Sequence, residues 1–257
     1  KKKHLPNLDI FDEHRYFESG NIANVFEIKG VSIGCPICED IWHDDVTKTL
    51  KSKGADLLLS PNGSPYERGK ILLRRNVVRE RCLETNVPII YLNLVGGQDD
   101  QVFDGGSFLM SKNGDVKVQL PQFEEKKLVL DLGIKENSVD SNSDVVTKIG
   151  DEMAQDYRAI AEGTKDYVLK SGFSKVILGL SGGVDSALVA TLAVDAFGPD
   201  NVTCVRLPSQ FSSEGSLNDA DKLTKKLGCQ TKTIPISKLH KTVLDLLSQN
   251  FRIPIRI

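Results

Sequence analysis

The chain has 257 residues, 40% of them hydrophobic, and a formal charge of −2, so it is long enough for one large domain or two ordinary ones. The balanced charge argues against general electrostatic attraction to nucleic acid or anionic membranes. No apolar run approaches the roughly 18 residues of a membrane span, and five scattered cysteines are unlike a secreted disulfide framework. We therefore expect a cytoplasmic protein that acts on small molecules.

Strands and helices alternate in the first half of the sequence. Two short apolar runs around Lys29-Gly30 predict a hairpin whose second strand covers residues 31–37. Periodicity and turn signals further predict helices over 46–53 and 67–85, strands over 55–59 and 87–95, and a hairpin over 108–120. We expect the arginines of the second helix, Arg74, Arg75, Arg79 and Arg81, on a solvated face or an interface. The pattern predicts an α/β sandwich.

A change in composition separates the two halves. Residues 133–150 are rich in small polar and charged residues and lack aromatic ones, which predicts a linker. Helical spacing follows from Met153, and then strands over 176–180, 202–207 and 231–236 alternate with helices, of which Ser216 opens the second and Ser237 the last. This order predicts a doubly wound parallel sheet that binds its ligand at the carboxyl ends of the strands.

The hexapeptide Ser181-Gly182-Gly183-Val184-Asp185-Ser186 carries the strongest chemical signal. It follows a predicted buried strand and opens a predicted helix, where backbone N–H groups and the helix dipole favour a phosphate. The glycines let the backbone turn close to the anion, the serines offer hydroxyl donors, and Asp185 supplies the oxygen ligands that Mg²⁺ prefers. The sequence lacks a Walker loop, so we interpret the hexapeptide as another type of phosphate loop.

This hexapeptide resembles the pyrophosphate loop of the N-type ATP pyrophosphatases, whose fold is adenine nucleotide alpha hydrolase-like. Within that family the surrounding motifs resemble NAD synthetase: Asp166-Tyr167, Gly172-Phe173, Gly179-Leu180, Leu207-Pro208-Ser209 and Asp219-Ala220. The resemblance implies that ATP and Mg²⁺ bind here and that the acceptor is nicotinic acid adenine dinucleotide. It assigns ATP binding to Gly179, Leu180, Ser181, Gly182, Gly183, Val184, Asp185 and Ser186, with Asp185 also as a magnesium ligand.

A second motif, Cys35-Pro36-Ile37-Cys38, has the spacing of zinc and redox sites. A zinc site needs a second pair of ligands, and His43 alone does not provide it. A redox motif would open a helix, whereas Cys35 lies within a strand pattern. We therefore interpret Cys35 as a core residue.

Cys38 differs because the run Ile-Cys-Glu-Asp-Ile-Trp resembles the nucleophile segment of nitrilase-like glutaminases. Further motifs of this family occur up to about residue 132: Leu5-Pro6-Asn7, Phe11-Asp12-Glu13-x-Arg15-Tyr16-Phe17, Ser64-Pro65-Tyr66-x-x-Gly69-Lys70, and Phe103-Asp104-Gly105-Gly106-Ser107. The resemblance implies a glutaminase with Cys38 as nucleophile and Lys2 as catalytic cation. It places the catalytic glutamate upstream, in sequence that this chain does not contain.

For glutamine itself, the resemblance implies contacts with Ser64 and Lys70. Related enzymes often have a glutamine-binding tyrosine at the position of Leu8, and leucine cannot donate that hydrogen bond.

Together the two resemblances imply a glutamine-dependent NAD synthetase, cut at both ends. Residues 1–132 would form part of the nitrilase-like sandwich, 133–150 the linker, and 151–257 the first part of the synthetase domain. Glutamine would supply ammonia to the adenylated dinucleotide in an enzyme that we expect to be a homo-oligomer, with no nucleic-acid or membrane partner. Two alternatives are another amidotransferase with the same loop, such as GMP synthetase, and an inactive nucleotide-binding fragment.

Overall fold

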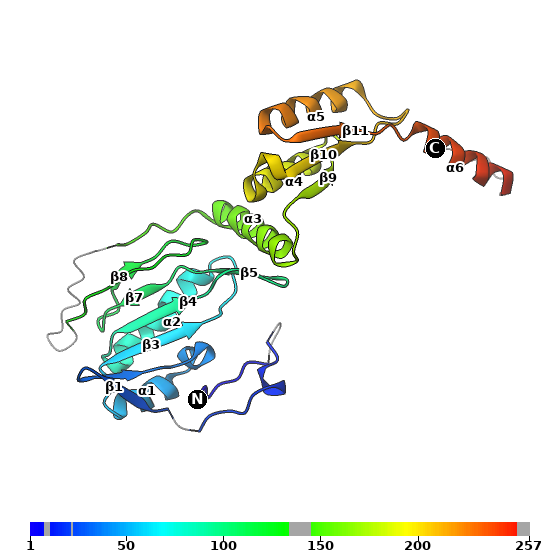
Figure 1. Cartoon of the computed structure of the whole chain (residues 1–257). Helices are drawn as coiled ribbons and strands as arrows, with labels where there is room; N and C mark the ends of the chain where they lie inside the picture. Colours follow the sequence, from blue (N-terminus) through cyan, green and yellow to red (C-terminus); the bar gives the residue numbers. More distant parts are fainter. Residues whose placement is uncertain (8–10, 22, 134–144, 251–257) are drawn as a thin grey trace. The chain divides into compact units, whose positions relative to one another are not determined.

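The computed structural model describes residues 1–7, 11–21, 23–133 and 145–250 (Figure 1). They divide into two compact units, Lys1–Ala159 and Ile160–Ile257. The boundary falls within one helix, α3 (Glu152–Lys170). None of the helices in the described ranges has the length and apolarity needed to cross a membrane.

Unit 1 is built on a six-stranded sheet with the order β1-β2-β3-β4-β7-β8. The three central strands are parallel, and the outer pairs are antiparallel. The elements of this unit before α3 are η1 (Glu13–Arg15), β1 (Val25–Ile28), β2 (Val31–Gly34), η2 (Cys38–Trp42), α1 (Asp44–Ser52), β3 (Leu57–Asn62), α2 (Lys70–Thr85), β4 (Ile89–Asn93), β5 (Val95–Gln98), β6 (Gln101–Asp104), β7 (Phe108–Met110) and β8 (Val116–Gln119).

One face of this sheet packs against α1 and α2. Alternating side chains along the strands meet the apolar stripes of both helices, which buries apolar surface on that side. The core comprises Ile41, Val46, Leu50, Ala55, Leu58, Val78, Cys82, Val87, Ile89, Tyr91, Phe108 and Met110. The α/β class predicted for this half is confirmed, with one layer of strands and one of helices among the described residues.

Several predicted boundaries in unit 1 shift for identifiable reasons. Strand β2 ends at Gly34, because Pro36 has no N–H to donate to a sheet, and Cys35 lies half-buried just beyond the strand. The strand predicted over 87–95 is two strands, since the chain leaves the large sheet after Asn93 and β5 pairs with β6. The hairpin turn at Lys29-Gly30 is confirmed, with both residues at positive φ.

Unit 2 contains a three-stranded parallel sheet with the order β11-β10-β9. Helices α4 and α5 connect successive strands and pack on a shared core formed by Leu180, Ala190, Ala193, Val202, Cys204 and Ala220. The predicted parallel strand–helix alternation is therefore confirmed. The elements are β9 (Val176–Gly179), α4 (Val184–Phe197), η4 (Pro199–Asn201), β10 (Val202–Arg206), α5 (Glu214–Leu227), β11 (Gln230–Thr233) and α6 (Ser237–Asn250).

The predicted cap of α5 is wrong by three residues. Ser213 caps this helix, and its hydroxyl accepts a hydrogen bond from the backbone N–H of Ser216 at 3.1 Å. Ser216 therefore lies inside the first turn. Serine is a favoured N-cap residue at either position. Ser213 is the cap because its backbone is still extended and the helix begins at the next residue.

Candidate active sites

Cys38 stands at a sharp turn after β2. Its φ of +49° lies in the left-handed region, which is uncommon for a residue with a side chain and costs on the order of 1 kcal/mol. The Cys38 side chain lines a cavity of about 700 Å³ in unit 1. The other lining residues are Lys1, Lys2, Leu5, Phe11, Glu13, Phe17, Glu18, Ile37, Pro61, Asn62, Gly63 and Leu94.

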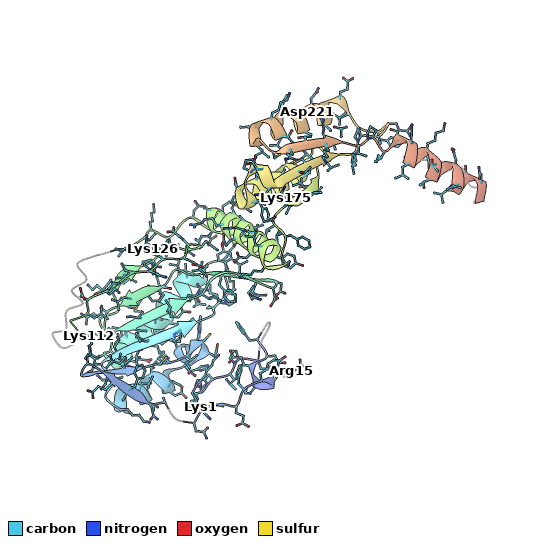
Figure 2. All side chains as sticks on the ribbon, viewed as in Figure 1. Lys1, Arg15, Lys112, Lys126, Lys175 and Asp221 are labelled. Atoms are coloured by element: carbon cyan, nitrogen blue, oxygen red, sulfur yellow. The ribbon has the colours of Figure 1, made fainter. Side chains whose placement is uncertain are left out.

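Lys2 enters the same cavity and is paired there with a carboxylate. Its Nζ lies 2.6 Å from both carboxylate oxygens of Glu13, at the start of η1. In Figure 2 the labelled residues Lys1 and Arg15 bound the segment that carries this pair. The sequence motifs did not single out Glu13, because the resemblance to glutaminases places the catalytic glutamate upstream. The only available signal was an acidic residue within the Phe11–Phe17 motif.

Asp40 joins the lysine segment to the cysteine turn. Its carboxylate is 1% exposed, and Oδ1 accepts the backbone N–H groups of Lys3 and His4 at 2.9 and 2.8 Å. Its Oδ2 accepts the N–H of Ile37 at 3.1 Å. A buried carboxylate is stable when several donors satisfy its oxygens. Asp40 therefore fixes the backbones beside Lys2 and Cys38 relative to one another.

The groups around Cys38 shift its pKa in opposite directions. Burial raises the pKa of the Cys38 thiol above its ordinary value, while the Gly63 N–H and the Lys2 ammonium lower this pKa. Glu13 and Glu39 raise the pKa further through their negative charge. Since only the thiolate is a strong nucleophile, burial limits how much of Cys38 is reactive, and Lys2 and Glu13 change that fraction in opposite directions.

Ser64 follows Gly63 and is held from several sides. The Nε of Arg74 donates to Ser64 Oγ at 3.1 Å, and Arg74 Nη2 donates to the carbonyls of Ser64 and Pro65, each at 2.8 Å. Arg74 also forms an ion pair with Asp104 at 2.8 Å, and both side chains are buried.

The expectation that all four helix arginines face solvent or an interface is therefore wrong for Arg74. It is also wrong for Arg81, which is 8% exposed. The helical pattern did not reveal this, because a buried arginine needs a carboxylate such as Asp104, which is 30 residues further along the chain.

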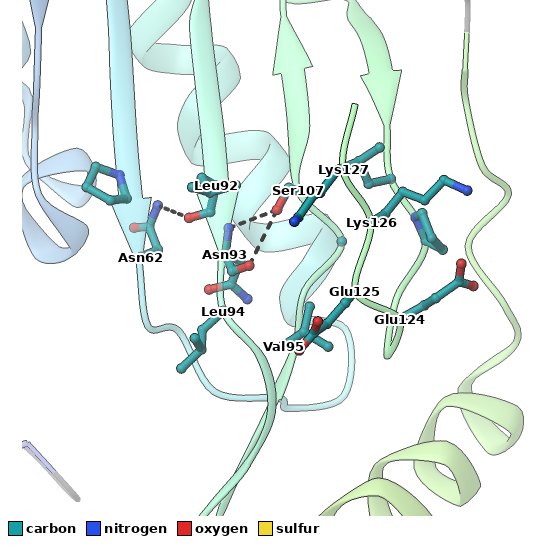
Figure 3. A pocket seen from close by; sticks show the side chains of 14 residues that line it. Asn62, Leu92, Asn93, Leu94, Val95, Ser107, Glu124, Glu125, Lys126 and Lys127 are labelled. Atoms are coloured by element: carbon teal, nitrogen blue, oxygen red, sulfur yellow. Dashed lines mark hydrogen bonds between the residues drawn. The ribbon is translucent and has the colours of Figure 1, made fainter. Parts of the chain in front are cut away.

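Asn93 also holds Ser64 in place. Its side-chain Oδ1 accepts the N–H of Ser64 at 2.9 Å, and its Nδ2 donates to the carbonyls of Ser64 and Gly105. Figure 3 shows Asn93, together with Asn62 and Ser107, on the wall of a second cavity of about 680 Å³. Pro61, Asn62 and Leu94 line both cavities.

Lys70 begins α2, and its Nζ lies 3.0 Å from a carboxylate oxygen of Glu67. Among the described residues, the lining of the Cys38 cavity includes neither Lys70 nor Ser64, although Gly63 belongs to it. The structure thus brings Cys38 and Lys2 together in one cavity, and the two predicted glutamine contacts are not among the described residues that line that cavity. Leu8 lies outside the described residues.

In unit 2 the predicted phosphate loop connects β9 to α4. The two serine hydroxyls, Ser181 and Ser186, lie 3.0 Å apart, and they accept the N–H groups of Gly183 and Ser181, respectively, at 3.2 Å each. Gly182 has a φ of +86°, as the sharp turn requires. The loop is exposed, and its own serines define its shape.

A cavity of about 310 Å³ lies at the carboxyl ends of β9 and β10. Its lining includes Gly179, Leu180 and Ser181, and also Arg206, Pro208 and Ser212 from the segment after β10. Ligands of parallel α/β sheets bind at this edge, as the sequence predicts.

Asp185 lies in the first turn of α4 and is exposed. Over the described ranges, no group of three or more His, Cys, Asp or Glu side chains is arranged to hold a metal ion. A single exposed carboxylate fits Mg²⁺ only where phosphate oxygens and water complete its shell, which is the usual way in which Mg²⁺ binds with nucleotides.

Two protein families match the chain. The carbon-nitrogen hydrolase family matches residues 1–139, more than half of the sequence. The chain belongs to the carbon-nitrogen hydrolase family. The NAD synthase family matches residues 156–253 of the same chain.

Individual relatives agree with both matches. The glutamine-dependent NAD(+) synthetase of Rhodobacter capsulatus is 51% identical over 91% of this chain and 43% of its own length. That of Xylella fastidiosa (strain Temecula1) is 43% identical over 98% of this chain and 46% of its own length. The predicted resemblance is thus confirmed, and the chain spans less than half the length of these relatives.

A solved structure supports the fold along the whole chain. The glutamine-dependent NAD+ synthetase from Acinetobacter baumannii, in complex with ADP, is 36% identical, with a TM-score of 0.92. The similarity covers 99% of this chain and 48% of that one.

Proposed function

We propose that the chain is the part of a glutamine-dependent NAD synthetase that carries the glutaminase nucleophile and the ATP phosphate loop. The observation that carries the glutaminase assignment is the placement of Cys38 on a left-handed turn, in one cavity with the Lys2–Glu13 pair. The names of the relatives supply the amide donor and the product, which geometry alone does not distinguish.

In the proposed first reaction, the Cys38 thiolate attacks the side-chain amide carbon of glutamine. Ammonia leaves with a proton, and a thioester remains that water hydrolyses to glutamate, releasing the thiol. The Gly63 N–H, which faces Cys38, and the Lys2 ammonium provide positive potential beside the reacting carbonyl. Ser64 and Lys70 are the proposed contacts for the polar ends of glutamine, and a further glutamate would serve as base.

In the proposed second reaction, ATP binds along Gly179–Ser186. The carboxylate of nicotinic acid adenine dinucleotide attacks the α-phosphate, pyrophosphate leaves, and ammonia then displaces AMP to give NAD. The Ser181–Ser186 loop at the start of α4 supports this assignment, because helix N-termini bind phosphate. The relative from A. baumannii was solved in complex with ADP, which supports the binding of an adenine nucleotide by this chain. Asp185 and the phosphates would hold Mg²⁺, which would neutralise charge on the leaving pyrophosphate.

Covalent labelling tests the glutaminase assignment on the chain itself. We expect the diazoketone analogue of glutamine, 6-diazo-5-oxonorleucine, to alkylate Cys38, glutamine to protect it, and peptide mass spectrometry to locate the adduct. Cys38→Ser is expected to remove the label, whereas the matched control Cys35→Ser keeps it. Labelling that glutamine does not reduce would contradict the assignment.

Nucleotide binding tests the second half. We expect ATP with Mg²⁺ to bind the chain in calorimetry, and Gly182→Val to abolish this binding. Dependence of ATP–pyrophosphate exchange on a nucleoside monophosphate, in place of the dinucleotide, would favour a GMP synthetase-like acceptor. The chain spans less than half of the length of the relatives that it matches. We therefore predict weak or no NAD synthesis by these 257 residues alone. A cytoplasmic location and a homo-oligomeric state also stay predictions.

A further inference from the structure

The segment from Gly63 to Lys70 contributes to the proposed glutamine site, and helix α3 contacts it by two separate routes. Asp156, in the second turn of α3, accepts a hydrogen bond from the Tyr66 hydroxyl at 2.8 Å and another from Arg68 Nε at 2.7 Å. It also forms an ion pair with Arg68. Tyr66 and Arg68 both lie between Ser64 and Lys70, and they are about 90 residues away from Asp156 in sequence.

The second route is buried and starts one residue earlier in α3. Gln122 Nε2 donates to the side-chain oxygen of Gln155 at 3.1 Å and to Asp104 Oδ2 at 2.9 Å. The other Asp104 oxygen receives Arg74 Nη1, and Arg74 Nε donates to Ser64 Oγ. These side chains are all at most 8% exposed, so water does not compete for their hydrogen bonds.

Apolar and cationic contacts complete the attachment of α3. The Tyr66 ring packs edge-on against Phe123, with centroids 5.4 Å apart, and the Arg158 guanidinium lies over the same Phe123 ring at 5.4 Å. The backbone N–H of Tyr66 donates to the carbonyl of Val102 at 2.7 Å. The Tyr66 side chain therefore has a defined place, and its hydroxyl contacts the Asp156 carboxylate of α3 directly.

We infer that Asp156 is a positioning residue for glutamine, which holds the Gly63–Lys70 segment through Tyr66 and Arg68. The helix that begins at Glu152 thus contributes to the geometry of the Cys38 site, although it follows the last strand of the large sheet by more than 30 residues. This inference rests on the proposed glutaminase function for its effect on glutamine, but not for the order that it imposes on the segment.

The variant Asp156→Asn removes the ion pair with Arg68 and keeps a group that Tyr66 can still contact. The rate at which 6-diazo-5-oxonorleucine labels Cys38 is measured at several concentrations of the analogue. This series gives two separate quantities, the binding constant of the analogue and the rate of alkylation once the analogue is bound. We expect binding to weaken about tenfold, the loss that corresponds to one charge-assisted hydrogen bond, with the bound rate unchanged. Asp156→Glu, which retains the charge, is expected to restore most of the binding.

Hydrogen exchange of the peptides that cover residues 63–70 gives a readout that does not depend on glutamine. In Asp156→Asn we expect these amides to exchange about fivefold faster, while α2 and the large sheet keep their protection. Tyr66→Phe, which loses the hydroxyl alone, should show a smaller change in the same peptides. The matched control is Glu162→Gln, since Glu162 is another α3 carboxylate, and its ion pair is with Lys165 of the same helix.

The outcomes are distinguishable. Exchange and analogue binding in Asp156→Asn equal to those of Glu162→Gln would overturn the inference. A uniform rise in exchange with a lower thermal midpoint would also overturn it, because that result indicates a general structural role. Absence of glutamine-protected labelling in the unmodified chain would instead contradict the proposed glutaminase function, and the exchange data would still decide whether Asp156 orders the segment.

Discussion

The two candidate sites are built in opposite ways. In unit 1, buried polar groups join segments that are distant in sequence around the Cys38 site: Asp40 links the Cys38 turn to the backbone of Lys3, and Arg74 with Asp104 fixes the segment after Gly63. In unit 2, Ser181 and Ser186 shape the predicted phosphate loop by local hydrogen bonds, and the loop is exposed. The first site depends on tertiary packing, whereas the second depends on a hexapeptide and the strand and helix beside it.

This difference predicts that single buried polar substitutions damage unit 1 far more than loop substitutions damage unit 2. Arg74→Met should have the largest effect, because it leaves the Asp104 carboxylate buried without its cation. We expect the free energy of unfolding to fall by about 3–5 kcal/mol. Urea unfolding followed by the fluorescence of Trp42, the single tryptophan, measures it. Arg79→Met, on the exposed face of the same helix, is the control and should change stability by less than about 0.5 kcal/mol. Equal losses in the two variants would contradict the comparison.

Asp40→Asn should have the next largest effect. The asparagine amide has one acceptor oxygen, whereas three backbone N–H groups need an acceptor. Its NH₂ group then faces at least one of these N–H donors, which cannot accept a hydrogen bond. We expect a loss of about 2–3 kcal/mol in the same unfolding experiment. Glu39→Gln, one residue away and partly exposed, should be close to neutral. An Asp40 variant as stable as the Glu39 variant would show that the Cys38 turn does not depend on this anchor.

The cation and the carboxylate beside Cys38 should change its reactivity in opposite directions. Lys2→Met removes a charge that lowers the pKa of Cys38, so the thiolate fraction falls at every pH below that pKa. Glu13→Gln removes a charge that raises this pKa, so the fraction rises. We expect changes of about 3- to 10-fold in the rate of alkylation by iodoacetamide, because that rate follows the thiolate fraction. In the unsubstituted chain the rate should still increase above neutral pH, because burial keeps the pKa raised. Rates that change in the same direction in both variants would be inconsistent with this electrostatic balance.

The smallest effect concerns unit 2 and the cap that sequence reasoning misplaced. Ser213→Ala should lower the local stability of α5 by about 1 kcal/mol, as loss of an N-cap hydroxyl usually does. Native-state hydrogen exchange of the α5 amides measures this opening. Ser216→Ala should have little effect, since its hydroxyl does not cap the helix. The reverse order would support the cap that the sequence pattern predicted.

The contrast between the units also explains what could be predicted from the sequence. The loop of residues 181–186, its strand and its helix follow from residues 176–197, so local patterns were sufficient to predict their structure, while phosphate binding by the loop stays a prediction. Cys38 and Lys2 were found through motif resemblance, and the cavity contains both. The pairing of Lys2 with Glu13 and the burial of Arg74 were missed, because each depends on a partner that no periodicity identifies. The Ser213 cap was missed for a local reason, since neighbouring serines fit the same pattern.

The close approach of Gly182 to helix α5 has a consequence for detecting ligands. A methyl group added at Gly182 would lie 2.1 Å from the backbone oxygen of Ser216, so loop and helix backbones are in direct contact there. A phosphate that changed the loop conformation would therefore also displace the first turn of α5. That turn is a natural place for a spectroscopic probe, such as a fluorophore on a cysteine introduced at the exposed position Glu214, that reports nucleotide arrival without touching the nucleotide.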